Sequence, residues 1–369
     1  MNKRVKRVLK IFELAFRRLT LLSLKIAGGN RAAQLSSAAL TLSPDPKILF
    51  LRQDRIGDAI ITTPLLVAVR TKYPNAKITF LLSKNNRAII PLLPIDCDTV
   101  IYQKSWLKDR AMLRLLRKQK FDVAIDMTDN ASVTSSILMA SIKPRFAIGI
   151  EKENAVVYDV LVPRIDREKN HISARIAELL RPLGIDPNTV NAKPQLRIKQ
   201  LQKVAGRLGI NISAGTESRW APETVYAEIA KQALQSKRWN EVAILAEPRD
   251  EIKAIEIEKL AGDARIQVMP VTGSYGDFAS SLSTCEALIS PDTSVVHLAA
   301  ALDLPQVVIY APIPKGLHYW TPIGVPYEMI VQSPSLATLE PHSVISLLRR
   351  LEAKLGNATP VVLPREQAL

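Results

Sequence analysis

Two short polar segments of the chain hold side chains that could bind or activate a ligand. The first follows the apolar run Ile48–Leu51, where Arg52, Asp54, Arg55 and Asp58 crowd one short loop. Open α/β sheets place their ligands where a strand ends in a turn and the next helix begins. So many charges in a crevice need partners or a ligand. The alternative for Asp58 is that it only caps the helix that follows.

The second segment, Ser290–Tyr310, contains polar residues between a predicted strand and a predicted helix. Free backbone N–H groups and the dipole at the start of a helix favour a phosphate or diphosphate. The hydroxyls of Thr293 and Ser294 add donors, and His297 lies one turn further on, where it could reach the same anion. Alternatively, Asp292 or Thr293 only caps the helix and His297 is a satisfied core residue.

Several common cofactor motifs are absent from the sequence. No G-x-G-x-x-G follows the first strand, and no G-x-x-x-x-G-K-[S/T] occurs. These absences argue against a dinucleotide-dependent oxidoreductase and a P-loop protein. The Asp96–Asp98 D-x-D pattern has no nearby oxygen ligands to complete a metal shell, so we interpret it as a solvated loop. We expect no metal and no cofactor. Cys97 and Cys285 are interpreted as buried thiols in a reducing compartment.

Alternating strands and helices would position both polar segments. In the first half we expect strands at Ile48–Leu51, Ile78–Leu82, Thr99–Tyr102 and Val123–Asp126, with helices at 107–119 and 171–183. In the second half we expect strands at Val242–Ala246, Ile266–Pro270, Ala287–Ile289 and Gln306–Tyr310, with helices at 223–236, 251–262, 295–302 and 341–355. This alternation predicts an α/β protein with two Rossmann-like domains that face each other across a cleft.

Four segments follow from this pattern. Residues 1–46 form a basic amphipathic helix and a linker, 47–186 an N-terminal Rossmann-like domain, 187–340 a C-terminal Rossmann-like domain, and 341–369 a last helix and tail. The stretch Gly184–Pro194 contains a helix-ending glycine and two prolines, which is typical of a linker between domains.

Nearly half of the excess positive charge lies in residues 1–46. They hold nine Lys or Arg against Glu13 and Asp45, a net +7 of the chain's total of +15. On a helical wheel, Lys3–Ile26 separates into an apolar face with Phe and Leu and a basic face. Such a helix suits the surface of an anionic membrane. The alternative is that its apolar face packs on the protein's own body.

This basic segment indicates neither a membrane span nor a nucleic-acid arm. Its longest uncharged run, Leu19–Leu24, is far shorter than the ~20 residues that a span needs. Glu13, Arg17 and Arg18 interrupt the apolar region that a signal peptide requires. A nucleic-acid binder would carry basic residues and aromatics on its folded body, whereas aromatics make up only 5% of this chain. No nucleic-acid partner is expected.

Together, the two polar segments resemble glycosyltransferase family nine, the ADP-heptose:lipopolysaccharide heptosyltransferases. Arg52–Leu66 is similar to the R-x-D-R-I-G-D-x-x-x-T-x-P-L-L signature at the N-terminal end of that family. Asp292–Pro305 is similar to its C-terminal signature, D-T-x-x-x-H-L-A-A-A-L-x-x-P. The resemblance extends over roughly residues 47–355. Weaker similarities lie at Phe121–Asp126, at His171 before Leu183–Ile185, and at Trp320–Pro322.

The resemblance implies a GT-B fold and an inverting, metal-independent sugar transfer. The domain 47–186 would then bind the acceptor and the domain 187–340 the nucleotide sugar. By the same resemblance, Asp58 is the general base that takes the proton from the acceptor hydroxyl, and Gly57 lets the backbone approach the sugar. A base together with stabilisation of the leaving group suffices for an inverting displacement. The expected acceptor contacts are Arg52, Arg55 and Asp126.

On the donor side, the resemblance assigns Asp292 to the sugar. It assigns the amides around Thr293 and Ser294, with His297, to the diphosphate. The acidic contact to the ribose is ambiguous between Asp250 and Glu251.

The chain also departs from the family pattern at two positions. Ser294 stands where the family usually has glycine, which makes the approach of the backbone to the diphosphate less open. Ser218 stands where the family often has lysine. Its neighbour Arg219 is the candidate for supplying the missing charge.

The leading hypothesis is therefore a heptosyltransferase-like enzyme that is peripheral on the inner, cytoplasmic face of the membrane. It would move a heptose or related sugar, from ADP-heptose, onto a lipid-linked acceptor of the lipopolysaccharide core or another envelope glycan. The alternative, motivated by Ser294 and Ser218, is a degenerate member that binds nucleotide sugars or glycans without turnover.

Overall fold

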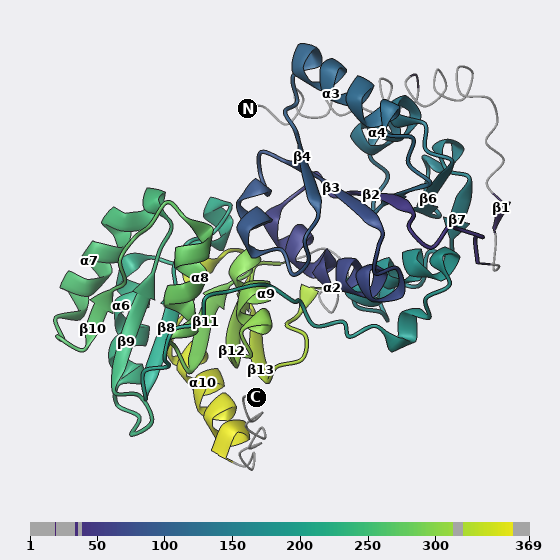
Figure 1. Ribbon diagram of the computed structural model, residues 1–369. Coiled ribbons are helices and arrows are strands. Elements are labelled where there is room, and N and C mark those ends of the chain that lie inside the picture. The colour runs from purple at the N-terminus through teal and green to yellow at the C-terminus, as the bar shows by residue number, and fades with distance from the viewer. Residues whose placement is uncertain (1–18, 20–33, 36–38, 313–319, 357–369) are drawn as a thin grey trace, which may run out of the picture. The chain divides into compact units, whose positions relative to one another are not determined.

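The computed structural model describes residues 19, 34–35, 39–312 and 320–356, which fall into two compact units (Figure 1). The first unit contains the described residues up to Arg197, together with Trp320 and Thr321. The second unit contains the described residues from Ile198 onward, except those two. The predicted basic helix, Lys3–Ile26, lies outside the described residues apart from Leu19, as does the tail 357–369.

The first unit is built on a parallel sheet with the strand order β1-β7-β6-β5-β2-β3-β4. The interior strand β2 reads Ile-Leu-Phe-Leu after its first residue, and these four side chains are fully buried. A strand of a parallel sheet is covered on both faces, so its sequence is a continuous apolar run. The strands are β1 (Gln34–Leu35), β2 (Lys47–Leu51), β3 (Lys77–Ser83), β4 (Asp98–Tyr102), β5 (Val123–Asp126), β6 (Phe146–Ile150) and β7 (Val160–Val162).

Helices connect these strands in the order that a βαβ fold requires. The α-helices are α2 (Ile56–Lys72), α3 (Trp106–Lys118), α4 (Val133–Ile142) and α5 (Ile172–Ala177). Short 3₁₀ turns lie at η1 (Arg87–Leu92), η2 (Ala155–Val157), η3 (Glu178–Leu183) and η4 (Pro187–Thr189).

Helix α2 runs without a break through an internal proline. Pro64 has no amide hydrogen, so the carbonyl of Ile60 loses its usual helical donor. The hydroxyl of Thr63 donates to that carbonyl at 2.7 Å, and Thr62 donates to the carbonyl of Ala59 at 2.7 Å. Hydroxyls bonded back to the preceding turn thus stabilise the helix at the proline. The start of α2, where Asp58 lies, is therefore part of a continuous, buried element.

The second unit repeats the design with a parallel sheet of order β10-β9-β8-β11-β12-β13. Its strands are β8 (Arg207–Asn211), β9 (Glu241–Leu245), β10 (Ile266–Val268), β11 (Ala287–Pro291), β12 (Gln306–Tyr310) and β13 (Tyr327–Val331). Its helices are α6 (Glu223–Ala233), α7 (Glu251–Ala261), α8 (Tyr275–Ser283), α9 (Ser294–Ala301) and α10 (Pro341–Gly356). The 3₁₀ turns are η5 (Glu217–Arg219), η6 (Pro248–Asp250) and η8 (Leu336–Thr338).

The division of the described chain differs in two places from the predicted one. The first unit ends at Arg197 rather than at residue 186, because the backbone amide of Arg197 donates to the carbonyl of Leu92 at 2.9 Å. The last helix, α10, packs against α6, β12 and β13 and so belongs to the second unit. The alternation predicted from the sequence also omits several elements that the structure contains: β1, α4, β6, β7, β8, α8 and β13.

Candidate functional site

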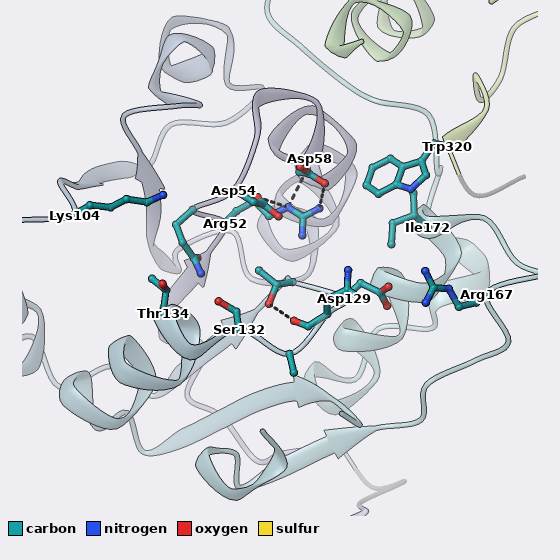
Figure 2. Close-up of a pocket in the computed structure, with 14 residues that line it drawn as sticks. Arg52, Asp54, Asp58, Lys104, Asp129, Ser132, Thr134, Arg167, Ile172 and Trp320 are labelled. Carbon is teal, nitrogen blue, oxygen red and sulfur yellow. Dashed lines mark hydrogen bonds and ion pairs between the residues drawn. The ribbon is translucent and has the colours of Figure 1, made fainter. Parts of the chain in front are cut away.

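A buried arginine organises the loop between β2 and α2. The guanidinium of Arg52, whose side chain is 2% exposed, donates to the backbone carbonyls of Asp58, at 3.1 Å, and of Met127. Its Nη2 lies 3.3 Å from Oδ1 of Asp58, and its Nε lies 3.4 Å from Oδ1 of Asp54 (Figure 2). Arg52 therefore holds two carboxylates and two neighbouring strand ends in fixed positions, and its side chain lines the cavity described below.

Asp58 lies in the first turn of α2 with its side chain 15% exposed. It is the third helical residue rather than the N-cap, which is Arg55. Its Oδ2 accepts from the backbone N–H of Arg55 at 3.2 Å, while Oδ1 faces Arg52. A negative charge in this position is stabilised by the helix dipole. Gly57 lies beside it inside the first turn, and the exposed side chain of Arg55 does not line the cavity.

Asp54 is a second carboxyl group in the same loop, and the sequence pattern alone assigns it no role. Burial, opposed by Arg52 and reinforced by the charge of Asp58, raises the pKa of Asp54 to about 6. Within the described part of the chain, its Oδ1 and the Oε1 of Gln53 are buried without a hydrogen-bond partner. Both side chains line the cavity. A ligand that carries hydroxyl donors would satisfy them.

These side chains line a cavity of about 370 Å³ at the carboxyl edge of the first sheet. One wall comes from the loop after β2, and the opposite wall comes from residues 128–134, between β5 and α4 (Figure 2). The remaining lining residues are Lys104, Arg167, Ile172 and Trp320. The charged groups are balanced, with Arg52, Lys104 and Arg167 against Asp54, Asp58 and Asp129. Such a polar cavity suits a polyhydroxylated ligand that bears both donors and acceptors.

The segment that carries Trp320 is held beside this cavity by a hydrogen bond between His171 and Thr321. His171 accepts from the backbone N–H of Ser173 with Nδ1, at 3.2 Å, so the proton lies on Nε2, which donates to the carbonyl of Thr321 at 3.0 Å. Burial lowers the pKa of His171 to about 4, which keeps the ring neutral. This hydrogen bond thus joins two of the segments with weaker similarity to the family, the one at His171 and the one at Trp320–Pro322.

Asp126 has a different role from the acceptor contact that the sequence analysis expected. It is fully buried and does not line the cavity. Its carboxylate accepts from Lys152 at 2.9 Å, from Thr128 at 2.7 Å and from the hydroxyl of Tyr158. Although burial alone raises the pKa of a carboxyl group, Lys152 and these donors hold that of Asp126 below its usual value. Asp126 therefore positions the loop around Thr128, and this correction follows from its burial.

Gly149 in β6 makes room for that network. A Cβ atom at this position would lie 2.8 Å from ring carbons of Tyr158. Only glycine therefore allows the ring to pack against the strand while its hydroxyl reaches Asp126.

Two of the predicted donor residues lie together at the carboxyl edge of the second sheet. Asp292 directly follows β11, and Arg219 ends the turn η5 after β8. Nη1 of Arg219 donates to the backbone carbonyl of Asp292 at 2.8 Å, and Nη2 lies 3.1 Å from its Oδ2. Ser218, in contrast, is exposed and pairs with the hydroxyl of Thr216 at 3.2 Å. Arg219, not Ser218, therefore brings a cation to Asp292.

The start of α9 carries the other predicted donor contacts. Thr293 is its N-cap, and its Oγ1 accepts from the backbone N–H of Val295 at 3.2 Å, so this residue caps the helix. The hydroxyl of Ser294 accepts from Tyr275 at 3.4 Å, and the side chain of His297 is buried. The side chain of Thr293 and the first backbone amides of this eight-residue helix therefore lie directly after Asp292 in the chain.

The structure distinguishes the two acidic residues between which the ribose contact was ambiguous. Asp250 is 2% exposed, with Nζ of Lys253 3.7 Å and Nε of Arg249 3.5 Å from its carboxylate. Lys253 in turn lies over the ring of Trp220, 2.8 Å from its centroid. Glu251 is exposed at the start of α7. Asp250 is thus the member of the pair that is connected to the residues around Arg219.

No cluster of three or more His, Cys, Asp or Glu side chains that could hold a metal ion occurs in the described ranges. Asp96, the first residue of the D-x-D pattern, is exposed and pairs with Arg197 at 2.6 Å. Of the helices that the structure describes, none combines the length and the apolar character needed to cross a membrane.

Comparison with known proteins identifies relatives of this chain. The family model "Glycosyltransferase family 9 (heptosyltransferase)" matches residues 110–340, which include Asp292 and Arg219 but not Asp58. Lipopolysaccharide heptosyltransferase 1 of Escherichia coli strain K12 is 23% identical over 300 residues, which cover 73% of this chain and 89% of that protein.

Solved structures show the same fold. A family 9 glycosyl transferase from Veillonella parvula matches with a TM-score of 0.72 and 16% identity, over 86% of this chain and all (100%) of that chain. The heptosyltransferase WaaC of E. coli, solved with ADP, matches with a TM-score of 0.68 and 16% identity, over 83% of this chain and 99% of that chain. The predicted GT-B fold, with two Rossmann-like sheets, is therefore confirmed.

The contacts of Arg52 predict a large loss of stability when its charge is removed. In Arg52→Met, the carboxylates of Asp54 and Asp58 lose their common cation, and breaking a buried ion pair in this way costs about 3–5 kcal/mol. The free energy of unfolding from urea titration should fall by an amount of that order. Arg55→Met, which changes an exposed side chain in the same loop, should lower the free energy of unfolding by less than about 1 kcal/mol. Equal losses in the two variants would contradict the role of Arg52.

The raised pKa of Asp54 predicts a specific pH dependence. Between its unfolded value of 3.8 and its folded value of about 6, the folded state holds a proton that the unfolded state has released. The contribution of Asp54 to stability is therefore greatest below pH 4 and falls as the pH rises to 6. In urea titrations, the free energy of unfolding of Asp54→Asn relative to that of wild type should therefore be higher at pH 7.5 than at pH 4.5. A difference that does not change with pH would contradict the raised pKa.

Proposed function

The chain belongs to glycosyltransferase family 9, the heptosyltransferase family, and on that basis we propose that it transfers a heptose from ADP-heptose to a lipid-linked acceptor. The acceptor is the lipopolysaccharide core or a related envelope glycan. The relative solved with ADP, WaaC, is a heptosyltransferase, and the sequence relative from E. coli K12 is a lipopolysaccharide heptosyltransferase. Both support this choice of donor and acceptor.

The observation that carries the proposal is the carboxylate of Asp58 at the edge of a polar cavity. Its position is fixed by Arg52 and by the amide of Arg55. A hydroxyl of the acceptor sugar within about 3 Å of this carboxylate could give up its proton as it attacks the donor. The buried oxygens of Gln53 and Asp54 would accept from other hydroxyls of the same sugar. The attack inverts the anomeric carbon, because the acceptor oxygen adds opposite to the departing diphosphate.

The second unit supplies the donor site in this proposal. The diphosphate lies at the start of α9, where backbone N–H groups and the helix dipole favour an anion. Arg219 adds positive charge beside Asp292. These groups stabilise the negative charge that develops on the leaving ADP. Asp250 is the ribose contact, and Asp292 contacts the transferred sugar.

The enzyme works at the inner face of the cytoplasmic membrane in this proposal, because its acceptor is amphiphilic. The basic segment Lys3–Ile26 supports this location by its charge and its apolar face.

Removing the carboxylate of Asp58 tests the proposed base. In Asp58→Asn, release of ADP from ADP-heptose in the presence of a lipopolysaccharide-core acceptor should fall by about 10²–10⁴-fold, which is the usual contribution of a general base. Asp45→Asn, at an exposed position just before β2, is the matched control and should retain the wild-type rate. Comparable rates in both variants would exclude Asp58 as the base.

The same assay separates transfer from binding alone. Saturable ADP binding by wild type, with no ADP release from ADP-heptose across a range of acceptors, would favour the degenerate, non-catalytic alternative. Ser294, at the start of α9, and Ser218, in the turn η5, are the residues that motivate it.

Arg219 gives a separate prediction for the donor half. Arg219→Ala removes a cation from the proposed diphosphate site, and a charge-assisted hydrogen bond contributes about 1.5–3 kcal/mol. The Kd for ADP, measured by calorimetry, should therefore rise about 10–100-fold. Arg265→Ala, at an exposed arginine that pairs with Asp263, should leave the Kd unchanged. A normal ADP affinity in Arg219→Ala would place the diphosphate elsewhere.

A further inference from the structure

A second, larger cavity lies between α3 and α4 of the first unit, which are neighbours in Figure 1. Its volume is about 820 Å³, against about 370 Å³ for the cavity at Asp58. Tyr102, Leu113, Ile137 and Leu138 give it an apolar lining. We call it the α3–α4 groove. Its size and apolar surface distinguish it from the polar cavity that the proposed function uses.

The α3–α4 groove is also strongly cationic. Lys104, Arg110, Arg114 and Arg117 line it together with a single carboxylate, Asp109. The Asp109 carboxylate accepts from the backbone amides of Gln103 at 2.9 Å and Ser105 at 2.7 Å, and the four basic side chains outnumber it. The groove therefore combines an apolar interior with an excess of positive charge, which matches an anionic amphiphile.

An exposed leucine extends the apolar surface beyond the groove. Leu107 is 74% exposed and lies on the same face of α3 as Arg110 and Arg114, three and seven residues further on. On α4, Ile137 is 40% exposed and also lines the groove. Exposed apolar side chains among Lys and Arg are typical of a helix that lies in a membrane interface.

The second unit offers a contrast that shows why the charge matters. Helix α7 also exposes apolar side chains, with Ile252 83% exposed. Its surroundings on the helix are acidic, however, with Glu251, Glu256 and Glu258 against two lysines. An anionic surface would repel this helix, whereas it would attract α3.

We propose that the α3–α4 groove and Leu107 form a docking surface for anionic phospholipid, with an acyl chain in the groove and the phosphates at its arginines. Lys104 and Thr134 line both this groove and the cavity at Asp58. A membrane bound there would hold a lipid-linked acceptor next to the base. This role rests on the proposed function, and it is separate from the basic segment Lys3–Ile26.

A fluorescent label reports the contact at α3 directly, in the full-length chain. Leu107→Cys, in a Cys97→Ser background because Cys285 is buried, is labelled with an environment-sensitive dye. Vesicles that contain phosphatidylglycerol should shift its emission to the blue, and brominated acyl chains should quench it. Phosphatidylcholine vesicles should do neither. Ile252→Cys on α7, labelled in the same way, is the matched control and should not respond.

The result that would overturn the proposal is an unchanged emission at position 107 while the protein sediments with the same vesicles. In that case another segment carries the membrane contact. An equal response at positions 107 and 252 would also overturn it, because the contact would not be specific to α3.

Charge reversal provides a second readout. Arg110→Glu with Arg114→Glu should weaken binding to phosphatidylglycerol vesicles by about tenfold or more, because each basic side chain near an anionic surface contributes to binding. Lys237→Glu with Lys259→Glu, two exposed lysines of the second unit, changes the net charge equally and should weaken it much less. Equal losses in the two double variants would contradict a specific surface.

Transfer to a water-soluble, delipidated acceptor separates this inference from the proposed function. The Arg110→Glu, Arg114→Glu variant should keep its wild-type rate with that acceptor. A wild-type chain that transfers no sugar but still inserts position 107 would refute the proposed function and leave the docking surface in place.

Discussion

The buried guanidinium of Arg52 is the interaction on which the candidate site depends. It connects the end of β2 to the carbonyl of Met127, after β5, and to Asp58 at the start of α2. The backbone carbonyl of Arg52 itself accepts from Asn86, in the loop after β3, at 2.7 Å. Removal of such a charge from water costs several kcal/mol unless its donors are satisfied. These contacts hold the loop that carries Asp54 and Asp58, because moving the loop away would take these acceptors from a buried cation.

In the second sheet, a neutral side chain connects neighbouring strand ends as Arg52 does in the first. Asn211, the last residue of β8, donates to the hydroxyls of Ser290 at 3.0 Å and Thr293 at 3.4 Å. Both Arg52 and Asn211 thus join neighbouring strand ends at the carboxyl edge of a sheet. The choice of residue has chemical consequences. The cation of Arg52 orients the carboxylates of Asp54 and Asp58, whereas the amide of Asn211 orients two hydroxyls and adds no charge beside the start of α9.

Local sequence patterns predict many of the strands and helices and the first wall of the cavity, but not its second wall. The uninterrupted apolar runs of β2 and β5 are recognisable because both faces of a parallel strand are buried. Asp58 follows from the same logic, since it comes just after such a strand. The polar run Asp129–Thr134 after β5 carried the same signal and was not assigned. Trp320 lies at the cavity because its neighbour Thr321 accepts a hydrogen bond from His171. These two residues are far apart in the sequence, so no local pattern shows the contact.

Asp126 shows that an acidic residue at the carboxyl end of a parallel strand does not always line the ligand site. Asp126 is an acidic residue at the carboxyl end of an apolar run, and Asp58 lies in the first turn of the helix that follows another such run. What separates the two is the surroundings of each carboxylate. Tyr158 packs over Gly149 and, with Lys152, covers Asp126 completely. These partners come from β6 and the segment around it, a region where the sequence analysis predicted no strand.

The position of Asp58, the proposed base, in a helix rather than in a loop explains how its carboxylate can be both fixed and available. Each oxygen of a carboxylate can accept two hydrogen bonds. Among the described residues, Oδ1 faces Arg52 and Oδ2 accepts from Arg55, so a lone pair on either oxygen has capacity for a substrate hydroxyl. Helix α2 is buried from Ala59 to Leu66 and continues through Pro64, so a shift of its first turn would disturb the core. The carboxylate is thereby oriented before any ligand binds, and binding the acceptor need not supply the energy to order it.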